Sequence, residues 1–306
     1  MPAGNITDRI PFTIVAETAY GPMILHRLDA GQGWPAIQTG RPLGFDEIRI
    51  LSDLARRLGD RCVFLDVGAN VGFFAVALGH AIGERGRVYC FEGQRIIFNM
   101  LAGSVALNGL LNVVCVNACV GRESGKLELP AFDYTRPLSF GSVEFGTEQR
   151  ERLSQDRRMG QDPEFVPLIT IDSMSLPKVS IIKIDVEGME IDVLDGARDT
   201  IRLNKPIIFA EYLKCGLNPL SEWLEGQGYT VADIGGYNLL ALPNEGANRL
   251  DDPRQVIEQL TKPPQQLPEA FNADVYLALH RDVRLSGIDP GTHYLGWGWR
   301  EGRRYR

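Results

Sequence analysis

The segment Val63–Phe74 limits the possible folds of this chain more than any other part of its sequence. It reads Val-Phe-Leu-Asp-Val-Gly-Ala-Asn-Val-Gly-Phe-Phe, so an apolar strand carrying Asp66 runs into a glycine turn and then into an apolar helix. In an α/β sheet, such a turn brings backbone N–H groups and the N-terminus of a helix up to a polar ligand. The segment therefore predicts a ligand-binding sheet of alternating strands and helices.

The glycine turn also indicates the kind of ligand. It lacks the middle glycine of G-x-G-x-x-G, which lets a dinucleotide fold bring its backbone up to a pyrophosphate. An acidic residue just before a two-glycine turn instead suits a ligand with an amino acid end, such as S-adenosylmethionine. We therefore expect Asp66, Gly68, Asn70 and Gly72 to bind this cofactor.

Glu92 closes the next apolar run, Arg87–Phe91, and lies 24 residues after Gly68. A carboxylate about 20 residues past the glycine turn can accept hydrogen bonds from both hydroxyls of a ribose, because it carries only acceptor lone pairs. Glu92 therefore favours an adenosine ligand. NAD also contains a ribose, so a nicotinamide-dependent oxidoreductase stays open as an alternative at this point.

Composition limits the kinds of partner. The chain has 306 residues, of which 44% are hydrophobic and 23% charged, as in globular proteins. Its net charge of −7 gives no support for a nucleic acid partner. The longest apolar region, Val63–Gly83, is interrupted by Asp66 and Asn70, so we expect no membrane span. The N-terminus, Met1–Pro11, is polar, so we expect no signal peptide. Five cysteines without C-x-x-C spacing predict free thiols in a reducing cytoplasm, and the scattered histidines give little support for a metal.

Between residues 44 and 243, apolar strands alternate with helical segments. This pattern predicts a doubly wound, mostly parallel α/β sheet, and a final pair of strands around Gly235-Gly236 predicts a hairpin that adds one antiparallel strand. Residues 121–165, with a charged stretch over 148–158, are long for a loop, and we expect them to be functional. The expected strands are 62–66, 88–92, 113–117, 181–185, 206–211, 229–234 and 237–242, and the expected helices are 44–58, 71–82, 94–108, 190–203 and 219–227.

The chain changes character near both ends. Residues 1–50 are expected to form a lead-in, either irregular or a short hairpin, and a helix, and residues 51–243 the cofactor-binding domain. Residues 244–268 are polar and rich in proline, which is typical of a linker with a short helix. Residues 269–306 are aromatic and charged, and we expect a small helical accessory unit there.

Four segments carry a family resemblance. The most specific is Ile182–Glu190, with the sequence Ile-Lys-Ile-Asp-Val-Glu-Gly-Met-Glu; the others are Phe64–Gly72, Val88–Glu92 and Pro206–Glu211, and Thr170–Met174 adds to them. Through these segments the chain resembles the FkbM-type methyltransferases, a branch of the class I S-adenosylmethionine-dependent enzymes. The resemblance covers roughly residues 45–215 and implies the class I methyltransferase fold.

The resemblance also implies a reaction. It implies O-methylation of a saccharide, a glycolipid or a natural-product hydroxyl. The sequence departs from the family at Ser139–Ser142, where the family often has an Asn-containing glycine turn, so contacts from this loop stay open. Residues 271–303 resemble a short module of bacterial glycan-synthesis and glycosyltransferase proteins, which supports a role in glycan biosynthesis. A non-catalytic binding protein in a glycan-assembly complex is the second alternative.

Three carboxylates are expected to meet near the transferred methyl group. Ligands lie beyond the carboxyl ends of strands in open α/β sheets. Asp185 ends the fourth strand, Glu187 lies in the turn after it, and Glu211 ends the fifth strand. A hydroxyl acceptor needs a base, and crowding of carboxylates raises the pKa of one of them toward neutrality. We expect Asp185 or Glu187 to be the base, Lys183 to hold a carboxylate ionised, and Glu211 to be a further candidate. A divalent metal bridging Asp185 and Glu211 ranks below a metal-free base.

Other polar residues near these strand ends have structural alternatives. The two carboxylates after the fourth strand could instead cap the next helix, and we expect Glu190 to do so. Asn117 ends the third strand, where class I methyltransferases often contact adenine, and is equally well explained as a polar strand terminus. Glu47 is expected to be a solvated helix carboxylate. Aromatic residues of the tail either stack on sugar rings or pack against the main domain; they are Tyr294, Trp297 and Trp299.

Overall fold

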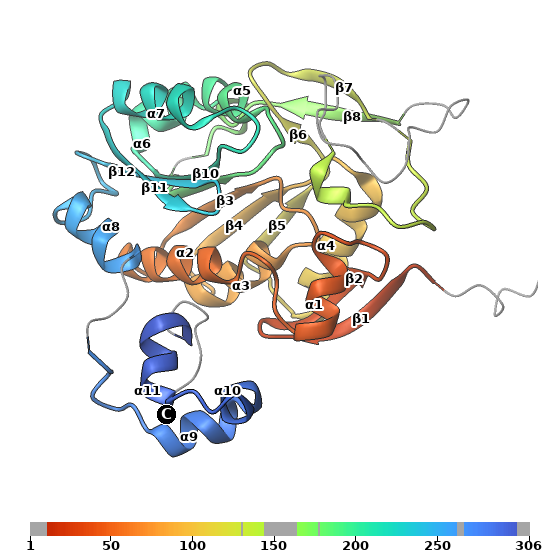
Figure 1. Ribbon diagram of the computed structural model, residues 1–306. Helices are drawn as coiled ribbons and strands as arrows, with labels where there is room; N and C mark the ends of the chain where they lie inside the picture. The colour runs from red at the N-terminus through yellow and green to blue at the C-terminus, as the bar shows by residue number, and fades with distance from the viewer. Residues whose placement is uncertain (1–10, 130, 144–163, 177, 262–265, 299–306) are drawn as a thin grey trace, which may run out of the picture.

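The computed structural model describes residues 11–129, 131–143, 164–176, 178–261 and 266–298. At its centre is a seven-stranded sheet with the order β11-β12-β10-β9-β3-β4-β5 (Figure 1). β12 runs antiparallel to both neighbours, and the pairings from β10 to β5 are all parallel. The predicted doubly wound sheet with one antiparallel hairpin strand is confirmed. The strands are β3 (Val63–Val67), β4 (Arg87–Phe91), β5 (Val113–Val116), β9 (Ile181–Ile184), β10 (Ile207–Glu211), β11 (Tyr229–Gly235) and β12 (Asn238–Pro243).

Helices cover both faces of this sheet, because side chains along each strand alternate between the two faces. On β3, Phe64 packs into the core on one face and Leu65 into the core on the other, and both are fully buried. The first layer consists of α2 (Phe45–Arg57), α3 (Phe73–Ile82) and α4 (Arg95–Leu107), and the second of α5 (Glu190–Asp195), α6 (Arg198–Asn204) and α7 (Leu217–Gly226) (Figure 1).

Two smaller sheets accompany the main one. β1 (Thr13–Thr18) and β2 (Gly21–His26) form an antiparallel hairpin, followed by α1 (Gly33–Thr39). The other sheet contains β6 (Cys119–Val120), β8 (Glu164–Ile169) and β7 (Gly125–Leu129). The region 121–165 is therefore partly sheet, because its two ends pair with each other as β7 and β8. Its charged stretch, 148–158, lies outside the described residues.

The single helix expected over 190–203 is wrong, because the chain forms two helices that are interrupted at Gly196. The carbonyl group of Gly121 occupies the space beside Gly196, so that a Cβ atom there would lie 2.0 Å from the Gly121 oxygen. The second helix, α6, then starts with Asp172 as its cap. The carboxylate of Asp172 accepts hydrogen bonds of 3.0 and 2.8 Å from two backbone N–H groups in the first turn of α6.

The region after the main sheet begins with a helix that belongs to the main core. α8 (Pro253–Thr261) buries Val256, Ile257 and Leu260 in the same core as α2 and α3. This packing is the reason that an amphipathic segment inside the proposed linker forms a helix. The proposed domain boundaries at residues 50, 243 and 268 stay predictions.

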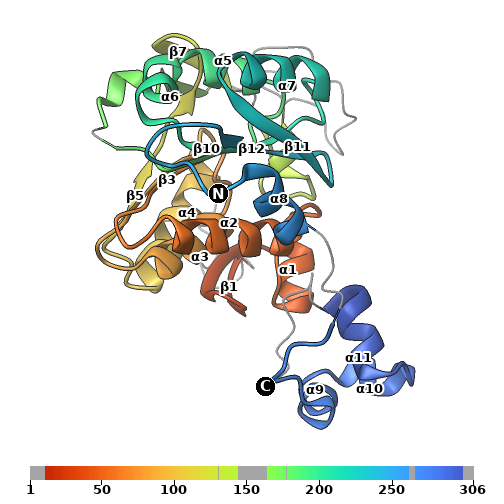
Figure 2. The same ribbon diagram turned by 90° about the vertical axis from the view of Figure 1, so that its left-hand side faces the viewer.

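A small helical unit follows. It contains α9 (Ala273–Leu279), α10 (Arg281–Ser286), α11 (Pro290–His293) and a π-helical turn (Tyr294–Gly298), and it lies apart from the sheet in both views (Figures 1 and 2). Its own core holds Tyr276, Val283 and Tyr294, and the Tyr276 hydroxyl lies 3.0 Å from Nδ1 of His293. Tyr294 thus packs inside this unit, whereas the side chains of Trp297 and Trp299 lie outside the described part.

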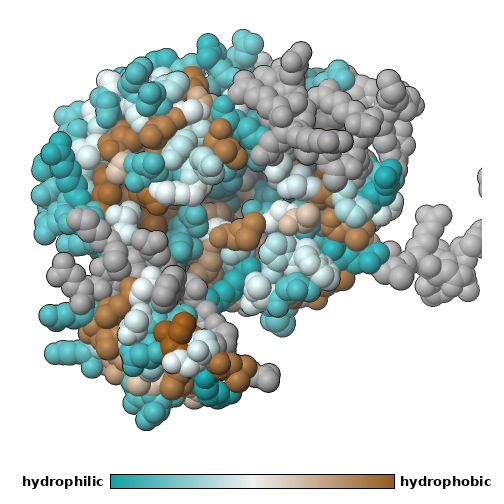
Figure 3. Space-filling view, in the orientation of Figure 1, coloured by the Kyte–Doolittle hydropathy of each residue, from teal (hydrophilic) through white to brown (hydrophobic). Residues whose placement is uncertain are grey.

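No helix in the described ranges combines the length and hydropathy needed to cross a membrane. The face drawn in Figure 3 carries mainly hydrophilic and neutral side chains, with separate groups of hydrophobic ones. All five cysteines carry free thiols, as predicted. Two of them, Cys90 and Cys115, are register partners on β4 and β5, and their Sγ atoms lie 3.5 Å apart.

We predict that Gly196→Ala destabilises the fold, because the new Cβ atom would force the Gly121 backbone to move. Overpacking of this kind costs about 1–3 kcal/mol, which urea denaturation measures directly. Gly125→Ala is the matched control, because nothing lies within 4 Å of a Cβ atom there. Equal stability of the two variants would show that the contact with Gly121 does not constrain the break between α5 and α6.

Candidate functional site

A cavity of about 260 Å³ lies at the carboxyl ends of the parallel strands β3, β4, β9 and β10. Open α/β sheets bind their ligands at this edge. Residues that follow these strands line it, among them Gly68, Glu92 and Asp185. The other walls come from the segments 31–32 and 42–44, before the main sheet, and from the loop 139–143.

The glycine turn after β3 is built as its sequence predicts. The backbone N–H groups of Gly68 and Ala69 both donate to the carbonyl oxygen of Phe91, at 3.1 and 2.9 Å. Gly68 has φ = 80°, and a Cβ atom there would lie 1.8 Å from the backbone oxygen of Asp185. Only glycine fits this position, because both the backbone angle and the neighbouring carbonyl exclude a side chain. The turn therefore ties the ends of three strands together around the cavity.

Glu92 is buried beside this turn and lines the cavity. Its two carboxylate oxygens accept hydrogen bonds from the backbone N–H groups of Asn70, at 2.9 Å, and Gln94, at 2.8 Å. Burial raises the pKa of Glu92 to about 7, against the lowering effect of these hydrogen bonds. Each oxygen keeps a lone pair for a ligand hydroxyl, so the predicted ribose acceptor is positioned by the same turn that it helps to hold.

The other predicted cofactor residues lie behind the cavity wall. Asp66 is fully buried, and its carboxylate lies 3.4 Å from Nζ of Lys183. Gly72 has φ = 96° at the start of α3 and would clash with Leu101 if it carried a side chain. The side-chain amide of Asn117 donates to the carbonyl oxygens of Glu92 and the next residue, at 2.8 and 3.1 Å. These three residues hold the wall, and the lining residues do not include them.

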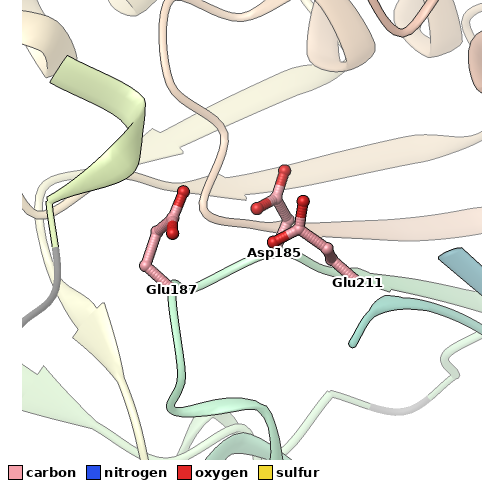
Figure 4. A group of neighbouring side chains, drawn as sticks. All are labelled: Asp185, Glu187 and Glu211. Atoms are coloured by element: carbon pink, nitrogen blue, oxygen red, sulfur yellow. The ribbon is translucent and has the colours of Figure 1, made fainter. Parts of the chain in front are cut away.

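Three carboxylates that line the same cavity lie close together. Asp185, Glu187 and Glu211 place carboxylate oxygens within 4.8 Å of one another. Figure 4 shows that all three point to the same side, with Asp185 and Glu211 side by side and Glu187 a little apart. Oxygen atoms at this spacing would also suit a divalent cation, and the absence of a metal stays a prediction.

Lys183 neutralises one of these carboxylates from inside the sheet. Its ammonium lies 3.3 Å from Asp185 and 3.4 Å from Asp66, and it donates to the carbonyl oxygen of Gly68 at 2.9 Å. Burial alone would lower the pKa of Lys183, but the two carboxylates outweigh it and raise the pKa above the ordinary value. The predicted pairing of Lys183 with a carboxylate is present.

The sequence pattern did not identify Lys214, which faces Glu187. Its ammonium lies 3.4 Å from Oε2 of Glu187, and the Lys214 side chain is almost fully buried. Glu187 has φ = 56°, so its backbone turns in the left-handed region and directs the side chain toward this lysine. Nothing in the local sequence signals the pair, because the two residues lie on separate loops.

Glu211 differs from its two neighbours. Within the described part of the chain, it has no ion pair with a lysine or arginine, and its Oε2 atom is buried without a hydrogen-bond partner. Burial, followed by repulsion from Asp185 and Glu187, raises the pKa of Glu211 to about 8. The site therefore contains two carboxylates next to lysines and a third carboxylate, Glu211, with a pKa of about 8.

For two neighbouring carboxylates, the sequence predicts one role correctly and one wrongly. Glu190 accepts hydrogen bonds from the backbone N–H groups of Val186 and Gly188, at 3.3 and 3.0 Å, as expected for a residue that caps the turn before α5. The expectation that Glu47 is solvated is wrong. It is half-buried on α2, and burial, then repulsion from Asp46 and Asp185, raises its pKa. α2 packs next to the site, which sequence periodicity does not reveal.

The loop where the sequence departs from the family pattern lines the cavity. Ser139 and Ser142 face each other with hydroxyl oxygens 3.0 Å apart. Gln94 connects this loop to the ribose acceptor, because its side-chain amide donates to the Phe140 carbonyl at 2.7 Å while its backbone N–H binds Glu92. The loop thus brings two serine residues to the cavity, where the family often has an asparagine-containing glycine turn.

The family of the chain follows from its central region. A family model described as the methyltransferase FkbM domain matches residues 66–231, which is more than half of the chain. The chain belongs to the FkbM methyltransferase family. It is therefore a methyltransferase, and S-adenosylmethionine is its cofactor. The nicotinamide-dependent oxidoreductase and the non-catalytic binding protein no longer apply.

Similar proteins are distant. The methyltransferase sdnD of Sordaria araneosa is 23% identical over 194 residues, which are 55% of this chain and 73% of that protein. A probable cobalt-precorrin-6B C(15)-methyltransferase of Sulfurisphaera tokodaii is 27% identical over 159 residues, 50% of this chain and 76% of that protein. The solved structure of methyltransferase FkbM from Methylobacillus flagellatus KT is 17% identical, with a TM-score of 0.43, and the match covers 60% of this chain and 44% of that one.

We predict that cofactor affinity rises by about tenfold between pH 6 and pH 8, because ribose hydroxyls donate to the ionised form of Glu92, whose pKa is about 7. Calorimetric titration with S-adenosylhomocysteine measures this. Glu92→Ala should bind roughly ten- to a hundredfold more weakly and lose this part of the pH dependence. The variant also serves as the control, because the amino group of the ligand titrates equally in both proteins. Identical pH profiles would remove Glu92 from the site.

Proposed function

We propose that this methyltransferase transfers the methyl group to a hydroxyl oxygen of a saccharide, glycolipid or natural-product acceptor. The observation that carries the proposal is the group of three carboxylates beside the glycine turn, one of which has a pKa near 8. A hydroxyl is a poor nucleophile until a base takes its proton, and a base works best with a pKa near the working pH. Acceptors that are already nucleophilic would not need such a group.

The residues around Glu92 and the glycine turn suit the cofactor. Glu92 offers unused lone pairs to the ribose, and Gly68 and Asn70 line the adjoining turn without bulky side chains. The N-terminus of α3 follows directly, so its partial positive charge favours the cofactor's carboxylate. We propose that Asp66, Gly72 and Asn117 contribute by holding these groups in place. The cofactor supplies an activated methyl group, so the protein mainly positions the two reactants and removes a proton.

We propose Glu211 as the group that removes the proton. Asp185 and Glu187 each lie within 3.4 Å of a lysine ammonium, so each of these carboxylates already has a positively charged partner. Burial of Glu211, and then repulsion from these two negative charges, raises its pKa to about 8. The sequence pattern favoured Asp185 or Glu187, since it did not reveal that Lys214 faces Glu187. All three stay candidates that the same experiment separates.

Replacing the base should lower the rate of methyl transfer by about 10²–10⁴-fold while leaving cofactor affinity unchanged. We expect this of Glu211→Gln, which keeps the shape of the side chain, and smaller losses from Asp185→Asn and Glu187→Gln. Because the base must be ionised, the wild-type rate should rise with pH and level off above about 8. Single-turnover kinetics across pH checks both points. Full activity in Glu211→Gln would assign the proton to another group.

The acceptor is best sought with labelled cofactor. The purified protein is incubated with S-adenosylmethionine carrying an isotopic methyl group and with glycan, small-molecule and RNA fractions from cells, and mass spectrometry locates the label. We expect the label on oxygen in the first two fractions. The net charge of −7 and the acidic end of the cavity would repel a phosphate backbone, so we propose that nucleic acid is not an acceptor. A label on nitrogen or carbon would contradict the proposed reaction.

We further propose that residues 269–306 help to recognise the acceptor or a glycan-assembly partner, in the cytoplasm. The resemblance of the tail to a module of glycan-synthesis proteins supports this role, and its own core around Tyr276 supports independent folding. Arg300, Arg303 and Arg304 suit phosphate or carboxylate groups, although they lie outside the described residues. The cytoplasmic location rests on the cysteine pattern alone.

Truncation after Pro268 tests the tail. We expect a folded protein with unchanged cofactor affinity and a raised KM for the acceptor, because α8 and the main core stay complete. Thermal unfolding with and without S-adenosylhomocysteine measures folding and binding together. An insoluble or cofactor-deficient truncated protein would show that the tail belongs to the catalytic core.

A further inference from the structure

Two large hydrophobic side chains are exposed at the cavity although they also line it. Leu43, between α1 and α2, is 65% exposed, and Leu213, just after β10, is 42% exposed. A side chain that contacts a cavity and solvent at once stands at its mouth. Figure 3 shows hydrophobic side chains at the surface in the middle of the face that Figure 1 presents. Scattered exposed leucines are ordinary, but two that border the same catalytic cavity are not scattered.

The structure holds Leu43 in place at this mouth. Its neighbour Pro42 is buried, and Gly44 packs so closely on Phe74 that a Cβ atom there would lie 3.1 Å from the ring. Phe74 lines the cavity itself, and the ammonium of Lys183 lies 5.0 Å from the centre of its ring. An apolar path therefore leads from Leu43 along Phe74 to the charged end of the cavity.

Leu213 lies far from Leu43 in the sequence but close to the carboxylate residues. It follows Glu211 by two residues and precedes Lys214, the partner of Glu187, by one. Leu213 and the three carboxylates line the same cavity. The lining of the cavity therefore combines the three carboxylates with two exposed leucines. An entirely hydrophilic acceptor would bury none of this apolar surface.

We propose that the acceptor is amphiphilic: a polar, hydroxyl-bearing part enters the cavity, and an attached hydrocarbon part packs on Leu43 and Leu213. This inference rests on the proposed O-methylation and narrows its acceptor class. The hydroxyl reaches the carboxylates, while the hydrocarbon covers apolar surface that would otherwise face water. Continuity of the apolar mouth with the catalytic cavity assigns it to the acceptor and not to a separate partner.

The first test measures binding without turnover. Methyl, hexyl and octyl β-glucosides are titrated calorimetrically, below micelle-forming concentrations, into protein saturated with S-adenosylhomocysteine. Affinity should rise at least about tenfold from methyl to octyl, since each fully buried methylene is worth about a fourfold change and only part of the chain is covered. The double variant Leu43→Ser, Leu213→Ser should lose this rise. Leu111→Ser is the matched control, because Leu111 is 97% exposed and does not line the cavity.

Cofactor affinity of the double variant reports whether it is folded. Absence of binding by every glucoside, an affinity that does not change with chain length, or an equal rise in the double variant would each overturn the proposal. Equal losses in the double variant and in Leu111→Ser would do the same, because they would show a general effect of surface hydrophobicity.

A second test follows the natural acceptor. The product labelled in the cell fractions is partitioned between water and butanol, and we expect the label in butanol. Label that stays entirely in water, or that is attached to a protein, would overturn the amphiphilic acceptor. If such a water-soluble product still carries the methyl on oxygen, the proposed O-methylation stands alone. If no fraction is labelled, the proposed function itself fails.

Discussion

The buried ammonium of Lys183 is the interaction on which the rest of the site depends. It joins β9 to the turn after β3 by contacting Asp66, Asp185 and the carbonyl oxygen of Gly68. A charge taken out of water is costly unless it is paired and hydrogen-bonded, so all three partners are needed at once. Removing the lysine would leave two carboxylates facing each other near the sheet, and the glycine turn would lose the group that fixes its carbonyl.

The three carboxylates of the site differ in whether a lysine lies next to them. Asp185 and Glu187 each have an ammonium within 3.4 Å, whereas Glu211 forms no ion pair with a lysine or arginine among the described residues. Burial and the neighbouring negative charges, and not the lysines, raise the pKa of Glu211 to about 8. A carboxylate can thus become a basic group through its surroundings alone.

The sequence predicted the main sheet well because its signals are local. Strand ends, the glycine turn and Glu92 follow from short patterns, and their places in the structure agree with them. Where prediction failed, the cause was a contact between distant segments: the Gly121 carbonyl breaks the helix at Gly196, and packing of α2 against the site buries Glu47. Lys214 and the mouth at Leu43 were missed for the same reason, since only the fold brings their loops to the cavity.

The cavity wall consists partly of strand ends and partly of loops, and these differ in how well they tolerate substitution. The cofactor side consists of strand ends and a turn where a carbonyl group and a positive φ permit only glycine at Gly68. Other parts of the cavity wall come from the segments 42–44 and 139–143, outside the regular strands. Loops tolerate substitution far better than strand ends do. A lineage could therefore exchange one acceptor for another by altering a few loop residues, while the machinery that holds the methyl donor is inherited unchanged.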